Sequence, residues 1–217
     1  MNLLQLRNLL TTDRLPQSPF AGMPDHASVL MPLFEKSGHA HVLAILKADT
    51  EGYPWRNQVA LPGGHVDDDD ENSLATAYRE LKEELNIDRE QVEVVGSLGF
   101  FQTIRATEIE AFVGVWNGDR SRLRFDPGEI SMILDIPLAG LIQTHVENFY
   151  AGSRPGVTRL IYPTGKKNQG EDIVVWGVTA MIFHYFLEHL RHLYPETFSA
   201  ENPSSVMGKT VYGRGVS

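Results

Sequence analysis

Three glutamates with helical spacing, Glu80, Glu83 and Glu84, are the residues most suited to chemistry in this sequence. In an α-helix, residues three and four apart share a face, so a helix here brings the three carboxylates together. Like charges at this spacing repel by about 0.2–0.5 kcal/mol per pair, and a bound divalent cation removes the repulsion. Carboxylate oxygens suit Mg²⁺ or Mn²⁺, which also bridge to substrate phosphates. Taken alone, such a trio is more often a solvated helix face, so its surroundings must decide.

The residues around the trio have the apolar spacing of a helix. Apolar side chains recur at steps of three and four and would form its buried stripe, at Leu74, Ala77, Tyr78, Leu81 and Leu85. Asn72 or Ser73 can cap the start, and Asn86 fits the left-handed residue that commonly ends a helix. We therefore expect a helix over Asn72–Asn86 with the carboxylates on the flank of its buried stripe.

A tight glycine turn precedes this helix. Pro62, Gly63 and Gly64 directly follow the apolar run 58–61, which we expect to be a strand. Glycine has no side chain, so its backbone can approach a ligand closely. A strand, a glycine turn, an acidic loop and an acidic helix in succession favour the cation site over the solvated face.

The rest of the chain predicts more strands than helices. We expect further strands at residues 28–34, 41–46, 92–101, 108–116, 122–125, 130–136, 158–162 and 172–176, and further helices at 2–10, 138–143 and 179–190. These elements indicate an α/β protein, an α/β/α sandwich with helices on both faces of a mixed β-sheet. We expect an N-terminal helix and loop over 1–27, one domain over 28–195 and a C-terminal tail over 196–217.

Charge and composition exclude several functions. The formal net charge is −9, and the stretch 65–90 alone holds ten acidic and three basic side chains. Broad nucleic-acid binding needs a basic surface, so we expect no nucleic-acid partner. No apolar run approaches the roughly 18–20 residues of a membrane span, and the first residues lack the pattern of a secretory signal, so we expect a cytoplasmic protein without membrane association. The chain has no cysteine, which excludes thiolate metal sites and cysteine nucleophiles.

Two competing ligand-binding motifs fail on spacing. In a calcium-binding loop starting at Asp67, Asn72 would stand where glycine is required, and Tyr78 would stand where the twelfth-position glutamate is required. The run GKT at 208–210 would need glycine at position 203 to form a phosphate-binding loop, and Pro203 stands there.

The run GGHVDDDDENSLATAYRELKEELNI, residues 63–87, resembles the signature sequence of the Nudix hydrolases. Its core RELKEE, residues 79–84, matches at every defined position, and the required seven residues separate Glu71 from Arg79. The sequence departs from the signature twice, because six residues instead of five separate Gly64 from Glu71, and Asn86 replaces a glycine. The longer loop and the run QVALPGG, residues 58–64, are similar to the coenzyme A pyrophosphatase-like branch. The resemblance covers residues 28–190, but the upstream run AILKADTEGYPWRN, residues 44–57, departs from that branch.

This resemblance implies hydrolysis of a phosphoanhydride bond with Mg²⁺ or Mn²⁺. Glu80 and Glu84 would be the main carboxylate ligands of the metal, the Gly64 carbonyl a further ligand, and Glu83 a ligand of a second ion or the base. Glu129, in the run DPGEI, is a candidate additional base or ligand from a distant loop. An acid after Pro-Gly also fits an ordinary turn residue, so both interpretations stay open for Glu129.

The expected substrate is a small molecule, a nucleoside diphosphate linked to another moiety. A coenzyme A-like compound is favoured, and ADP-ribose or a nucleotide sugar comes second. A Nudix-like module that binds a nucleotide without hydrolysing it is the alternative from another class. The resemblance also implies a homodimer.

Four cationic residues are candidates for a role at the site, one structural and three in substrate binding. We expect Arg79 to be structural, reaching from the helix to a loop carboxylate such as Glu71 and so fixing the loop. Arg56, Arg105 and Lys166 stand in predicted loops near the expected mouth of the site and are candidate substrate contacts. Each of these three is also consistent with an ordinary surface charge.

Overall fold

The computed structural model describes residues 3–12, 26–52, 55–104, 106–153 and 159–198. Its helices are α1 (Leu3–Thr12), α2 (Ser73–Leu85), α3 (Leu138–Glu147) and α4 (Gly177–Leu193), with short 3₁₀ turns η1 (Arg89–Gln91), η2 (Arg120–Arg122) and η3 (Pro195–Phe198). Its strands are β1 (His26–Lys36), β2 (His39–Lys47), β3 (Val59–Ala60), β4 (Gly63–His65), β5 (Val92–Gln102), β6 (Glu108–Trp116), β7 (Ile130–Pro137), β8 (Tyr162–Asn168) and β9 (Glu171–Val175). No helix within these described ranges is long and apolar enough to cross a membrane.

Seven of the strands form one mixed sheet, whose main order is β3-β2-β1-β6-β5, with β4 paired to β1 and β7 paired to β2. β1 and β6 run parallel to each other, and the other strand pairs of this sheet are antiparallel. β8 and β9 form a separate antiparallel hairpin. The expectation of a mixed sheet is confirmed.

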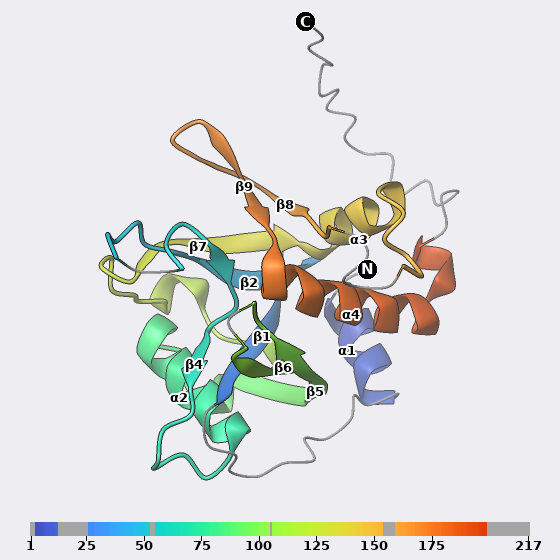
Figure 1. The fold of residues 1–217 in the computed structure, drawn as a ribbon. Helices are drawn as coiled ribbons and strands as arrows, with labels where there is room; N and C mark the ends of the chain where they lie inside the picture. Colours follow the sequence, from blue (N-terminus) through green and yellow to red (C-terminus); the bar gives the residue numbers. More distant parts are fainter. Residues whose placement is uncertain (1–2, 13–25, 53–54, 105, 154–158, 199–217) are drawn as a thin grey trace, which may run out of the picture.

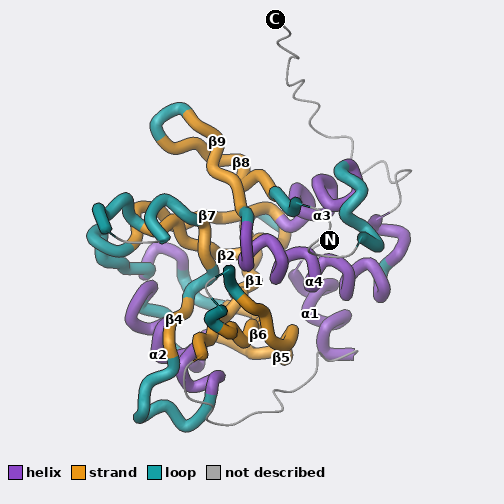
Figure 2. Tube along the Cα trace, viewed as in Figure 1, coloured by secondary structure: helices purple, strands orange, loops and turns teal. Residues whose placement is uncertain are grey.

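The sheet is covered by helices on both faces (Figure 1). Successive side chains of a strand point to opposite faces. Leu30 of β1 packs in a core with Leu81 of α2, whereas the next residue, Met31, belongs to a second core with residues of α1, α3 and α4. Figure 2 shows α2 on one side of the strands and the other three helices on the opposite side. The expected α/β/α sandwich is therefore confirmed.

The sheet opens between β1 and β2, and this opening positions the glycine turn. β6 occupies one edge of β1, while β2 holds the other edge only at Leu33–Lys36. β4 pairs with that second edge at Ala27–Val29, and the Leu30 N–H donates to the Pro62 carbonyl at 3.0 Å. β3 meanwhile pairs with β2. The segment 58–65 thus bridges the opening and carries the glycine turn into the middle of the sheet.

Three predictions about secondary structure are wrong in whole or in part. The strand expected at 122–125 is absent, because the backbone there follows η2 and the Arg124 N–H donates to the carbonyl of Leu85, at the end of α2. The glycine turn is itself partly a strand, β4, since the open edge of β1 offers it partners. Of the strand expected at 158–162, only Tyr162 lies in a strand, and Thr158 lies outside the described residues. The N-terminal loop at 13–25 and most of the predicted tail, 199–217, also lie outside them.

Candidate active site

The helix that carries the glutamates begins and ends where its capping residues predict. The Asn72 side chain accepts a hydrogen bond from the Ala75 N–H at 3.0 Å, and the helix starts at Ser73. Asn86 adopts the left-handed conformation, with φ 57°, and its N–H donates to the carbonyls of Leu81 and Lys82. This cap explains how asparagine can stand where the family signature has glycine.

The three glutamates differ sharply in burial. The Glu84 side chain is 6% exposed, that of Glu80 16% and that of Glu83 58%. We expected all three carboxylates beside the buried stripe of the helix, but Glu84 lies within the stripe, together with Thr76 and Leu81. The trio therefore spans the border between the core and the solvent.

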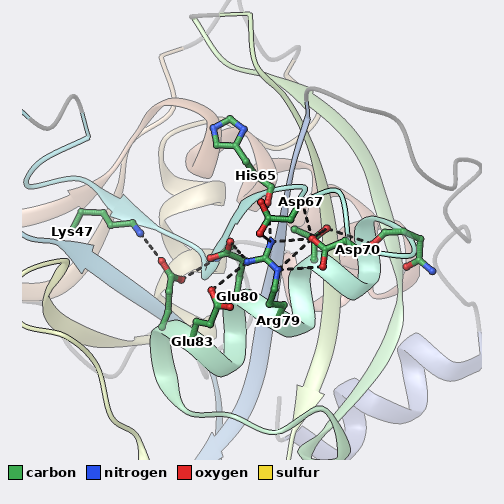
Figure 3. A network of polar contacts seen from close by, with 11 residues as sticks. Lys47, His65, Asp67, Asp70, Arg79, Glu80 and Glu83 are labelled. Carbon is green, nitrogen blue, oxygen red and sulfur yellow. Dashed lines mark hydrogen bonds and ion pairs between the residues drawn. The ribbon is translucent and has the colours of Figure 1, made fainter.

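Both carboxylate oxygens of Glu84 are bonded inside the protein. Its Oε1 lies 2.6 Å from Nζ of Lys47, the last residue of β2, and its Oε2 accepts the Gly63 N–H at 3.0 Å. Burial raises the pKa of Glu84 above its usual value, although the Lys47 ammonium and the Gly63 N–H act in the opposite direction. Figure 3 shows Lys47 reaching from its strand toward the carboxylates of α2. These bonds join α2 to both sides of the opening in the sheet.

Both glycines of the turn have close neighbours at the position where a side chain would begin. A Cβ on Gly63, whose φ is +152°, would lie 2.2 Å from the Ser28 carbonyl oxygen and 2.7 Å from the Cα of Val29. A Cβ on Gly64 would lie 2.3 Å from Oε1 of Glu80. The Glu80 carboxylate thus lies directly against the Gly64 backbone, as the sequence predicted for a turn that approaches a ligand site.

Arg79 joins the acidic helix to the loop before it (Figure 3). Its NH1 donates to Glu80 at 2.8 Å and to Glu83 at 3.2 Å. Its NH2 donates to Asp70 at 2.9 Å and to the carbonyl of His65 at 3.0 Å. One guanidinium therefore contacts the loop, the end of β4 and two of the three glutamates.

The loop partner of Arg79 is Asp70, however, and the expected partner Glu71 is exposed. The turn from Asp67 to Asp70 is the physical reason. The Asp70 N–H donates to the Asp67 carbonyl at 3.0 Å, and the Thr76 hydroxyl donates to the Asp70 carboxylate at 2.9 Å. These two bonds hold the Asp70 carboxylate in place, so that it faces the guanidinium.

Asp70→Asn should reduce stability in a pH-dependent way. The Arg79 guanidinium holds the pKa of Asp70 down to about 2, from 3.8. A carboxyl group with a depressed pKa in the folded state stabilises it fully above its unfolded pKa, and this stabilisation is lost as pH falls toward the folded pKa. The difference in free energy of unfolding between wild type and Asp70→Asn should therefore be constant above about pH 5 and shrink between about pH 4 and pH 2.

Urea unfolding at a series of pH values measures this difference. Asp69→Asn is the matched control, because Asp69 is an exposed acid of the same loop, and we expect little effect at any pH. A difference for Asp70→Asn that stays the same from pH 6 to pH 2 would contradict the assigned ion pair.

A cavity of about 530 Å³ adjoins the glycine turn. Lys47, Gly63 and Gly64 line it and also contact the glutamates of α2, so the carboxylates and the cavity share a wall. The rest of the lining is largely apolar and includes two indole rings, those of Trp55 and Trp176. The volume suits a small molecule of the size of a nucleotide derivative.

Two of the cations expected to contact a substrate, Arg56 and Lys166, are not among the described residues that line this cavity. Arg56 is exposed and lies 3.6 Å from Asp49, and Lys166 is exposed on β8. Arg105 lies outside the described residues. The lysine and arginine side chains in the described lining are instead those of Lys47 and Arg159, for which spacing in the sequence gave no signal.

Glu129 lies in a turn, as one of its two interpretations predicts. Its side chain is exposed, and its carbonyl accepts the Ala48 N–H at 2.8 Å. The turn is also tied to this segment through the Thr50 hydroxyl, which donates to the Gly128 carbonyl. Glu129 is therefore held beside the end of β2, next in space to the segment that carries Lys47.

The donor groups at α2 fit a hard divalent cation. Within the described ranges, no three His, Cys, Asp or Glu side chains are already arranged around a single point as metal ligands. Glu80, Glu83 and Glu84 nevertheless offer oxygen donors within one helical turn, and Arg79 and Lys47 now provide the positive charge that these carboxylates need. These are the oxygens that would hold a divalent ion, which would supply that charge when bound.

A mixed sheet between helices, with an acidic helix held against a glycine turn, defines the class as a Nudix-type α/β domain. Residues 24–150, more than half of the chain, match the family model described as NUDIX domain. The chain therefore belongs to the Nudix hydrolase family, and the expectations of this family and of a hydrolase are confirmed.

Relatives with curated descriptions agree with this assignment. The chain is 29% identical over 166 residues to the uncharacterized Nudix hydrolase NudL of Photorhabdus laumondii. The aligned residues make up 76% of this chain and 85% of that protein. It is 30% identical over 168 residues to the human mitochondrial coenzyme A diphosphatase NUDT8. The aligned residues make up 77% of this chain and 70% of that protein. A solved MutT/nudix family protein from Enterococcus faecalis matches 85% of this chain and 68% of its own, with 17% identity and a TM-score of 0.48.

Proposed function

We propose that this protein hydrolyses a phosphoanhydride bond in a nucleoside diphosphate linked to another moiety, in the presence of Mg²⁺ or Mn²⁺. The observation that carries the proposal is the position of the α2 carboxylates, which lie against the glycine turn at one end of a cavity large enough for such a substrate. A diphosphate and a cluster of carboxylates repel each other, so a cation is needed between them.

Each glutamate of α2 has a role that its burial suits. Glu84, which is buried, and Glu80, which is half-buried, would hold the metal together with the Gly64 carbonyl. When bound, the metal supplies charge stabilisation at the phosphoryl oxygens and lowers the pKa of water. Glu83 is the most exposed of the three and can move without losing a buried bond. It would hold a second ion or accept the proton of the attacking water.

A coenzyme A-like substrate is favoured over the alternatives. The run QVALPGG and the relative named as a coenzyme A diphosphatase both support it. The apolar lining with two indole rings suits a substrate with an extended uncharged part, and Arg159 can bind an anionic group at the cavity. ADP-ribose and nucleotide sugars are the second choice, since both combine a diphosphate with a planar base.

A panel of diphosphate compounds tests the proposal. Purified protein is incubated with coenzyme A, ADP-ribose or a nucleotide sugar, with Mg²⁺, with Mn²⁺ or with excess EDTA, and the phosphomonoester products are separated and quantified. We expect metal-dependent cleavage that is fastest with coenzyme A. If a compound raises the melting temperature but no compound is cleaved with either metal, the protein is a nucleotide-binding module and the proposal is wrong.

A further inference from the structure

We propose that the N-terminus of α4 forms an anion subsite, at which Arg159 and Thr179 bind a phosphate monoester that the substrate carries in addition to its diphosphate. The inference rests on the proposed function, which it extends by naming a further group of the substrate. Coenzyme A has such a monoester on its ribose, whereas ADP-ribose and nucleotide sugars have none. The subsite would therefore select coenzyme A-like compounds from the other diphosphates.

The subsite belongs to a part of the cavity lining that is separate from the glycine turn. β8 and β9 pair at Tyr162 and Val175, so the residues just before β8 lie near those just after β9. Arg159 comes from the first of these segments, and Thr179 from the second, which is the first turn of α4. Both residues line the same cavity as Gly63 and Gly64. One substrate can therefore reach the α2 carboxylates and the start of α4 together.

The start of α4 is open toward the cavity. Its N-cap residue, Trp176, makes no side-chain capping bond, and residues 176–179 all line the cavity. A Cβ on Gly177 would meet nothing within 4 Å, so no other group fills the space beside the first turn. The first N–H groups of a helix have no partner within the helix, and its dipole makes this end positive. The geometry thus suits an anion.

Thr179 gives an independent indication of a ligand at this end of α4. The residue is only 7% exposed and lines the cavity. Its hydroxyl forms no hydrogen bond with any residue that the structure describes. A buried hydroxyl without a partner is costly, and a ligand in the cavity would remove this cost. A phosphate oxygen can accept the hydrogen bond that the hydroxyl is free to donate.

Arg159 supplies the charge of the subsite. It is exposed and lines the cavity, whose described lining contains no aspartate or glutamate to neutralise it. A guanidinium donates two parallel hydrogen bonds to a phosphate, which gives it both affinity and orientation. The guanidinium, the hydroxyl and the first N–H groups of α4 together offer more donors than the two oxygens of a carboxylate can use. A phosphate monoester, with three terminal oxygens, fits them better.

Coenzyme A and dephospho-coenzyme A test the subsite, because they differ only in the phosphate monoester. The wild-type kcat/KM should be about tenfold or more higher for coenzyme A, as expected for a charge-assisted contact. Arg159→Gln should reduce this preference to about twofold or less by slowing the cleavage of coenzyme A alone. Thr179→Val keeps the shape of the side chain and should reduce the preference by about threefold to tenfold, because one donor is lost.

Lys166→Gln is the matched control for Arg159→Gln. Lys166 is an exposed cation of β8 and is not among the described residues that line the cavity. The control variant therefore removes the same charge from the same part of the chain without touching the subsite. Its preference for coenzyme A should stay within about twofold of wild type, as for positions that share no partners. Arg159 is itself exposed, so its variant should fold like wild type by circular dichroism.

A wild-type preference below twofold would overturn the inference, and so would an unchanged preference in Arg159→Gln or an equal loss for both compounds. Failure of the proposed function looks different, since the wild-type protein then cleaves neither compound with either metal. In that case calorimetric titration with adenosine 3′,5′-bisphosphate and with AMP decides, because neither contains a phosphoanhydride bond. Tighter binding of the bisphosphate that is lost in Arg159→Gln would support the subsite, and equal affinities in wild type would overturn it.

Discussion

Glu84→Gln should lower kcat/KM for diphosphate hydrolysis by about a thousandfold or more. Each tenfold loss corresponds to about 1.4 kcal/mol of transition-state stabilisation, so this change removes about 4 kcal/mol. The large effect is expected because Glu84 is the most buried of the three glutamates, and the amide keeps its shape while losing its charge. The Gly63 N–H still has an oxygen acceptor, whereas Lys47 and the metal lose their anion.

Steady-state kinetics at several metal concentrations measures the effect of Glu84→Gln. Glu83→Gln should also abolish most of the activity, with less change in stability, because Glu83 is largely exposed. Glu90→Gln is the control, an exposed acid of η1 outside the site, and should behave as wild type. Undiminished turnover in both Glu83→Gln and Glu84→Gln would refute the assigned site.

Gly63→Ala should lower the free energy of unfolding by more than about 3 kcal/mol, which is above the range of most single substitutions. The added Cβ would meet the backbone of β1, at the Ser28 carbonyl and the Val29 Cα, and neither of these can move without opening the strand pair. Its positive φ adds backbone strain for alanine. Urea unfolding followed by circular dichroism measures the loss.

Gly64→Ala is the matched comparison, because the same methyl group there meets only the end of the Glu80 side chain. That carboxylate can move, so the protein should fold with a much smaller loss of stability. Activity should nevertheless fall by at least about tenfold, since Glu80 is pushed from the turn where it would hold the metal. Wild-type stability of Gly63→Ala, or full activity of Gly64→Ala, would show that the turn is not packed as described.

The parts of the site that the sequence predicted depend on local physics. The apolar spacing of α2 and its two asparagine caps act within a few residues, so the boundaries of the helix could be predicted almost to the residue. The glycine turn at 63 and 64 is also evident from its residues, although the atoms that these glycines approach lie on β1 and α2. The place of Glu84 within the buried stripe was not predicted, because the burial of one flank depends on the strands that cover it.

The parts that could not be predicted depend on distant contacts. Lys47 ends a strand and has no neighbour in sequence that marks it, and only the opening between β1 and β2 brings it to Glu84. Asp70 stands where Glu71 was expected, because the bonds of Asp70 to Asp67 and Thr76 orient its carboxylate toward Arg79. The prediction for Arg56 and Lys166 rests on their charge in predicted loops, and charge alone does not tell which loop faces the cavity. The strand expected at 122–125 failed for a similar reason, since its backbone is bonded to the end of α2.

The central claim is that the carboxylates of α2 bind a divalent ion beside the glycine turn. The most direct measurement is anomalous X-ray diffraction at the manganese edge from crystals grown with Mn²⁺. We expect an anomalous peak about 2.0–2.3 Å from carboxylate oxygens of both Glu80 and Glu84, as for an oxygen-bound ion of this class. An anomalous map in which Mn²⁺ is bound only elsewhere, with Lys47 still on Glu84, would contradict the claim.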